Sequence, residues 1–85
     1  MPTGRASTKP QGALEVAMLT IILRAMAEQG VTRDALARAA GMSPSQLTNV
    51  FKGSKTARFS EIAGMCEALG LRLSDVAEAA AREAG

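Results

Sequence analysis

The feature that most constrains this chain is the stretch from residue 33 to residue 53, which reads RDALARAAGMSPSQLTNVFKG. It contains two short amphipathic segments on either side of Ala40-Gly41-Met42. The second segment opens with Ser43-Pro44-Ser45-Gln46. These residues carry three helix-start signals, because serine can cap, proline suits the first helical position and glutamine can close a capping box. The pattern predicts two short helices that meet through a tight turn.

The apolar positions in this stretch are those that a close crossing of two helices requires. Positions at helical spacing that should face inward are apolar in both segments; they are Leu36, Ala40, Leu47, Val50 and Phe51. Ala37 is small where the second helix must pass over the first, and Gly41 is free to adopt the left-handed conformation of the turn. We therefore predict a helix-turn-helix.

Length and composition limit what this motif can belong to. Eighty-five residues make one small domain, near the lower end of what a single core can stabilise without disulfides or metal. Cys66 is the only cysteine and is expected to be a small core residue. A reducing compartment, the cytoplasm, is expected for such a chain. Because the chain has no His, no Tyr and no Trp, we expect no catalytic site, no metal and no cofactor.

The longest apolar run, residues 16–23, does not indicate a membrane protein. It reads VAMLTIIL and stops at Arg24, far short of the roughly 20 apolar residues that a membrane span needs. It also lacks the small-residue cleavage site of a secretion signal.

The first helix is expected over about residues 13–29, and it carries two apolar stripes at helical spacing. The stripe expected to face the core is Leu14, Met18, Ile21, Ile22 and Ala25. The second stripe is Val16, Leu19, Leu23 and Met26. A small domain struggles to bury a helix on two sides. The second stripe is therefore either ordinary core or an interface with a second copy or another protein.

The remaining elements are also predicted to be helices. Thr32 is expected to cap the second helix, a fourth helix to run from about residue 59 or 60 to Leu69, and a last one from Ser74 to about Glu83. No segment has the alternation of a strand. The sequence predicts an all-α fold, a compact five-helix bundle in which helices 2 and 3 form the helix-turn-helix.

Charge is unevenly distributed along the chain. Residues 33–58 have one acidic residue, Asp34, and five basic ones, a net charge of +4; the basic residues are Arg33, Arg38, Lys52, Lys55 and Arg58. Residues 59–85 have two basic and five acidic residues, a net charge of −3. The positive charge lies on the helix-turn-helix, an arrangement suited to meeting a polyanion through one face.

Three groups of residues resemble a known family. They are Leu36-Ala37 three residues before Ala40-Gly41, the segment 43–53 ending in Phe51-Lys52-Gly53, and Ile62 followed by Glu67-Ala68-Leu69-Gly70. Together they resemble the helix-turn-helix domains of phage Cro and repressor proteins, the lambda-repressor-like fold, over about residues 13–80. The resemblance implies a sequence-specific DNA-binding transcriptional regulator, of phage or prophage repressor type. It implies a homodimer on a two-fold double-stranded operator, cytoplasmic in a bacterial host, either associated with the nucleoid or encoded by a phage.

The resemblance also implies which residues contact DNA. Bases would be read in the major groove from the helix 44–52, by Ser43, Ser45, Gln46, Asn49 and Thr48. Helical geometry places Ser45, Asn49 and Lys52 opposite the core-facing positions. Asn49 is expected to contact adenine, whereas Ser43 is expected mainly to cap. Pro44 departs from the family pattern and this helix has no Arg for guanine, so DNA shape should carry part of the specificity.

Phosphate contacts are expected on either side of the reading helix, from Thr32, Arg33, Lys52, Lys55 and Arg58. Arg38 either faces solvent, pairs with a neighbour or touches DNA.

Residues 1–12, MPTGRASTKPQG, are predicted to be a flexible basic arm before a domain over residues 13–85. The arm is either a terminus without a role or a segment that lies along DNA.

A second hypothesis comes from a different functional class. The chain would be a protein-interaction module, of antitoxin or phage-regulator type, that binds another protein through the second stripe of its first helix. The two hypotheses can both hold. An enzyme ranks below both, since no nucleophile and base pair or phosphate-cradling glycine loop is evident.

Overall fold

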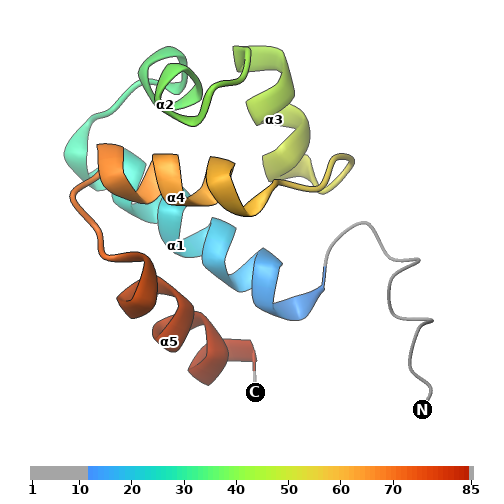
Figure 1. Ribbon diagram of the computed structural model, residues 1–85, viewed down its shortest axis with the longest axis vertical. Coiled ribbons are helices and arrows are strands. Elements are labelled where there is room, and N and C mark those ends of the chain that lie inside the picture. Colours follow the sequence, from blue (N-terminus) through green and yellow to red (C-terminus); the bar gives the residue numbers. More distant parts are fainter. Residues whose placement is uncertain (1–11, 85) are drawn as a thin grey trace.

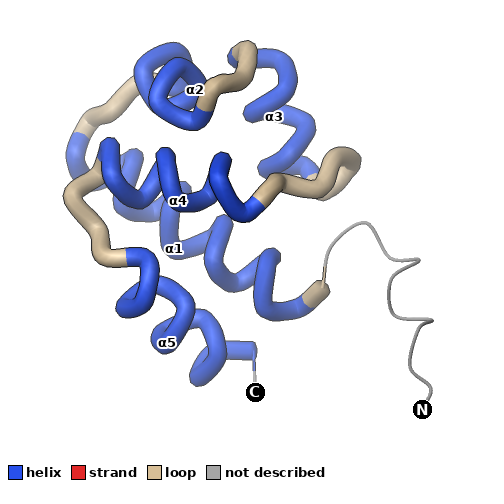
Figure 2. The backbone as a smooth tube through the Cα atoms, viewed as in Figure 1, coloured by secondary structure: helices blue, strands red, loops and turns tan. Residues whose placement is uncertain are grey.

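The computed structural model describes residues 12–84, and this part of the chain is all-α (Figure 1). Its helices are α1 (Ala13–Gln29), α2 (Arg33–Ala40), α3 (Pro44–Lys52), α4 (Phe59–Ala68) and α5 (Leu73–Ala84). Figure 2 shows them joined by loops, with no strand in the part described. The predicted five-helix, all-α fold is confirmed. The predicted arm, apart from Gly12, lies outside the described residues.

Local hydrogen bonds determine where α2 and α3 begin. The hydroxyl of Thr32 accepts a hydrogen bond from the backbone N–H of Ala35 at 3.1 Å. At the start of α3 the Ser43 hydroxyl accepts from the N–H of Gln46 at 3.2 Å, and the Gln46 side-chain oxygen accepts from the N–H of Ser43 at 2.9 Å. Gly41 ends α2 with a φ of 74°, a left-handed conformation that costs glycine little. Both predicted caps and the predicted turn are confirmed.

The core is built from aliphatic, methionine and small side chains of all five helices. α1 packs along α5, and α2 packs against both α3 and α4. The largest fully buried side chains are Ile22, Leu36, Leu47, Met65, Val50 and Cys66. Each large aliphatic side chain removed from water contributes about 1.5–3 kcal/mol. A hydrogen bond of 2.8 Å from the Gln29 side chain to the carbonyl of Leu69 joins the ends of α1 and α4.

The α1 helix differs from expectation on both of its apolar stripes. Leu14, which was expected in the core, is 42% exposed; it lies in the first turn of α1 and lines an open hollow between α1, α4 and α5. The second stripe divides. Leu19 and Met26 are buried in the core, whereas Val16 and Leu23 are 49% and 37% exposed. Leu19 and Met26 therefore follow the alternative of ordinary core, because α3, α4 and α5 all contact α1, whereas an interface at Val16 and Leu23 stays a prediction.

The start of α5 differs slightly from expectation. α5 begins at Leu73, one residue earlier than expected. None of the helices in residues 12–84 is long and apolar enough to cross a membrane.

Candidate nucleic-acid interface

α3 turns one face to the core and the other to solvent. Leu47 and Val50 are fully buried, which fixes the rotation of the helix about its axis. Ser45 and Asn49, four residues apart, are both exposed, and so is Lys52. Thr48 is half-buried at the edge of this face. The structure thus brings Ser45, Asn49 and Lys52 together as the helical pattern predicts.

The first turn of α3 is occupied by its own capping box. The Ser43 hydroxyl and the Gln46 side-chain oxygen each hold a backbone N–H. Both side chains are exposed, but these bonds fix their orientation. The Gln46 amide group still has its N–H donors, while Asn49 has a side chain free of capping duty. Asn49 is therefore better suited than Gln46 to a two-bond contact with a base.

The basic loop after α3 folds back against the end of that helix. The carbonyl oxygen of Asn49 accepts hydrogen bonds from the N–H of Ser54 at 3.0 Å and of Lys55 at 3.3 Å. It also accepts one from the Ser54 hydroxyl at 3.2 Å. Lys55 is half-buried, whereas Arg58, at the end of the loop, is exposed. The loop is thereby attached to the residue that is the best candidate for reading a base.

The start of α2 lies against the end of α3 through one cation–π contact. The guanidinium carbon of Arg33 is 5.4 Å from the centroid of the Phe51 ring. Arg33 and Thr32 are both exposed. Phe51 is half-buried, so the expectation that it faces the core describes only part of its surroundings. Sequence reasoning missed this contact because nothing local indicates that the two helix ends meet.

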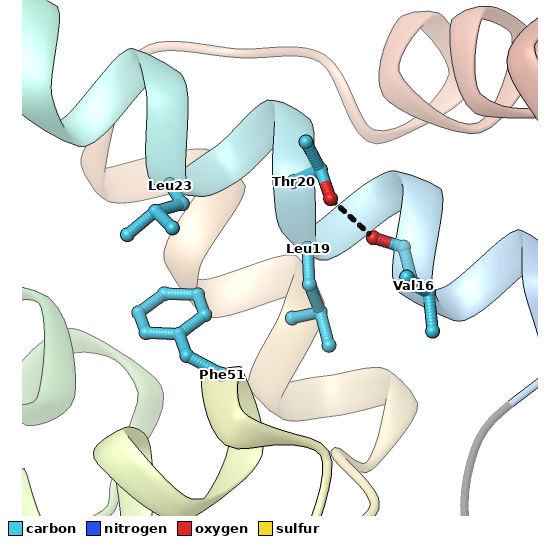
Figure 3. A pocket seen from close by; sticks show the side chains of 5 residues that line it. All are labelled: Val16, Leu19, Thr20, Leu23 and Phe51. Atoms are coloured by element: carbon cyan, nitrogen blue, oxygen red, sulfur yellow. Dashed lines mark hydrogen bonds between the residues drawn. The ribbon is translucent and has the colours of Figure 1, made fainter.

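A shallow hollow lies between α1 and α3 beside Phe51 (Figure 3). Phe51 points from α3 toward Leu19 and Leu23 of α1, with Val16 further along the same helix. Three residues of the predicted interface stripe therefore line one hollow, and Met26 is not among them.

Charge is separated along the molecule. α2 and α3 lie at one end of the long axis and α5 lies at the other (Figure 1). The segment with a net charge of +4 includes α2, α3 and the loop after them, while the acidic segment forms α4 and α5. Arg38 is exposed in the last turn of α2. The exposed polar face of α3 thus lies at the basic end of the molecule.

Residues suited to other chemistry are few. No group of three or more His, Cys, Asp or Glu side chains within residues 12–84 could hold a metal ion. Cys66 is buried, and burial raises the pKa of its thiol, which disfavours the reactive thiolate.

Comparisons with a family model and with solved structures both match this chain to DNA-binding or gene-regulatory proteins. The model of the Cro/C1-type HTH DNA-binding domain matches residues 22–81. Among solved structures, the chain is similar to the clp gene regulator ClgR from C. glutamicum, with a TM-score of 0.71 and 32% sequence identity. That similarity covers 89% of this chain and 97% of the ClgR chain. No significant match is found among curated proteins.

Proposed function

This chain belongs to the Cro/C1-type family of helix-turn-helix DNA-binding domains, and we propose that it binds a double-stranded operator with α3 in the major groove. The chain is a DNA-binding regulator of transcription and not an enzyme. The observation that carries the proposal is the solvent-facing side of α3, where Ser45 and Asn49 are exposed beside Lys52 at the basic end of the molecule.

Base reading is assigned first to Asn49 and Ser45. Asn49 would pair with the N6 and N7 positions of adenine, a contact worth about 1–3 kcal/mol of discrimination. Ser45 would contact a base one helical turn earlier. Ser43 and Gln46 support the helix start through the capping box, with the Gln46 amide N–H groups as additional donors, and Thr48 lies at the edge of the groove. Because no Arg lies on α3, DNA shape and deformability would supply further specificity.

Phosphate binding is assigned to groups on both sides of α3. At the start of α2 these are Thr32 and Arg33, together with backbone amides that lack helical partners. At the end of α3 and in the loop they are Lys52, Lys55 and Arg58. These contacts would set the affinity and its dependence on salt. The acidic α5 would point away from the DNA.

We further propose that the protein acts as a homodimer on a two-fold operator and represses by occupying a promoter, as phage or prophage repressors do. The bacterial cytoplasm would be its place of action. The structurally similar ClgR is a gene regulator, which supports a regulatory role here.

A second candidate function is binding of another protein through α1. Val16 and Leu23 favour it, because both are exposed apolar side chains beside the hollow at Phe51. The same surface could instead serve the homodimer.

Selection of bound duplexes from a random-sequence pool tests the proposal. We expect enrichment of a two-fold site whose half-sites lie about one helical turn, roughly 10 base pairs, apart. A bound pool with no sequence preference would contradict operator recognition by α3.

A further inference from the structure

We propose that Phe51 is a positioning residue for DNA binding, whose ring holds the Arg33 guanidinium at the start of α2 ready for a backbone phosphate. The inference rests on the proposed function and deepens it, because it assigns to Phe51 a role beyond packing.

The contact joins two ends of the helix-turn-helix that are distant in the sequence. Arg33 is the first residue of α2, and Phe51 lies in the last turn of α3. The distance of 5.4 Å from the guanidinium carbon to the ring centroid is within the range of about 6 Å for a cation–π interaction. A guanidinium is also planar, so it can lie against a ring in a way that the compact ammonium of lysine cannot.

The ring is fixed by the protein, whereas the arginine is not. Phe51 is half-buried and faces Leu19 and Leu23 of α1 (Figure 3). Arg33 is exposed, and no carboxylate within residues 12–84 forms an ion pair with it. Within residues 12–84, the aromatic ring is therefore the group that contacts the Arg33 guanidinium. A side chain that is already oriented loses less conformational freedom when it binds a phosphate.

The surroundings of Arg33 suit a phosphate. The Thr32 cap holds the amide of Ala35, and the amide of Leu36 makes the first helical hydrogen bond to the Thr32 carbonyl at 3.0 Å. The amides of Arg33 and Asp34 come before that bond, where a helix has no partners for its own N–H groups. The Asp34 carboxylate opposes an anion here, so the position of the Arg33 charge matters more.

A double-mutant cycle distinguishes this role of Phe51 from a purely structural one. If Phe51 acts through Arg33, the effect of replacing Phe51 on DNA affinity depends on whether Arg33 is present. The variants are Phe51→Leu, which keeps an apolar side chain without the ring, Arg33→Gln, which removes the charge, and the combination of both. Phe51→Tyr keeps the ring and serves as the matched control. Circular dichroism confirms that each variant is folded, and affinity is measured on one duplex at two salt concentrations.

We expect Phe51→Leu to weaken binding about two- to fivefold, the scale of one cation–π contact at an exposed site. Arg33→Gln should weaken it further and reduce the slope of log K against log salt by about 1. Phe51→Leu should have no additional effect in the Arg33→Gln background, and Phe51→Tyr should bind like the parent. An equal effect of Phe51→Leu in both backgrounds would overturn the proposal, and so would no effect at all.

Two further outcomes keep the inference separate from the proposed function. If the parent protein binds no DNA, the proposed function fails. If the parent binds and Arg33→Gln changes nothing, the present inference fails together with the assignment of Arg33 to a phosphate, while DNA binding by the protein stands. Should Phe51→Leu not fold, Arg33→Lys replaces it: the charge stays but the planar contact is lost, and binding equal to the parent would overturn the proposal.

Discussion

A Cβ atom placed on Gly64 of α4 would lie 2.6 Å from the carbonyl oxygen of Ala39 in α2. It would also lie 3.3 Å from the Cα of Ala40. The two backbones therefore approach more closely at this point than any side chain would allow. α4 supports the first helix of the helix-turn-helix through this contact, so the position of the DNA-binding unit depends on a glycine outside it.

Replacing Gly64 by alanine should destabilise the protein. The added methyl group must push α2 and α4 apart, at a cost of about 1–3 kcal/mol. This outweighs the gain of about 1 kcal/mol in helix propensity. Urea denaturation measures the difference, with Glu67→Ala on the exposed side of α4 as a control expected to change stability by less than about 0.5 kcal/mol. A Gly64→Ala variant as stable as the parent would contradict the close contact.

The two serines at the start of α3 should behave differently. Ser43→Ala removes the cap and should cost about 0.5–2 kcal/mol of stability. Ser45→Ala, on the exposed face, should leave stability nearly unchanged and weaken binding to the preferred operator instead. Thermal unfolding and DNA binding of both variants check this, and equal losses of stability would show that the capping box does not hold the helix.

Asn49 and Lys52 should separate base reading from phosphate binding. Asn49→Ala should remove preference at one base pair, worth about 1–3 kcal/mol. Lys52→Ala should weaken binding to all sequences alike and lower the salt slope by about 1. Competition binding against single-base variants of the selected site measures both effects. If Asn49→Ala weakened every site equally, the assignment of Asn49 as a reader would be wrong.

The exposed part of the α1 stripe offers a test of the homodimer. Leu19 is buried, so a charge there would disrupt the fold, whereas Leu23 is exposed and can be replaced. Leu23→Glu should reduce dimer formation, measured by light scattering of the protein alone and on the selected duplex. Arg24→Glu, exposed one residue further along α1, is the matched control. A dimer that survives Leu23→Glu with the fold intact would exclude this surface as the interface.

Local signals made most of the fold predictable. The hydrogen bonds that end or begin these helices join residues only a few positions apart in the sequence, as at Thr32, Gly41 and Ser43. The sequence alone therefore locates the helix-turn-helix. Burial of Leu47 and Val50 follows from helical spacing and also determines which side of α3 faces outward.

The features that could not be predicted depend on how closely two helices approach each other. The spacing of apolar residues along the sequence does not encode that distance. Leu14 has the right spacing for the core but borders an open hollow between α1, α4 and α5. Gly64 and the contact between Arg33 and Phe51 each require the approach of two separate helices. Which residues touch DNA, and whether a second copy binds, stay predictions for the same reason, since both concern partners outside the chain.

Titration of the protein into a mixed-sequence duplex at about 50 and 200 mM salt tests whether the basic end of this molecule binds DNA. For about five phosphate contacts, the affinity should fall several-hundred-fold between the two concentrations. Absence of binding, or binding that does not change with salt, would contradict the proposed interface.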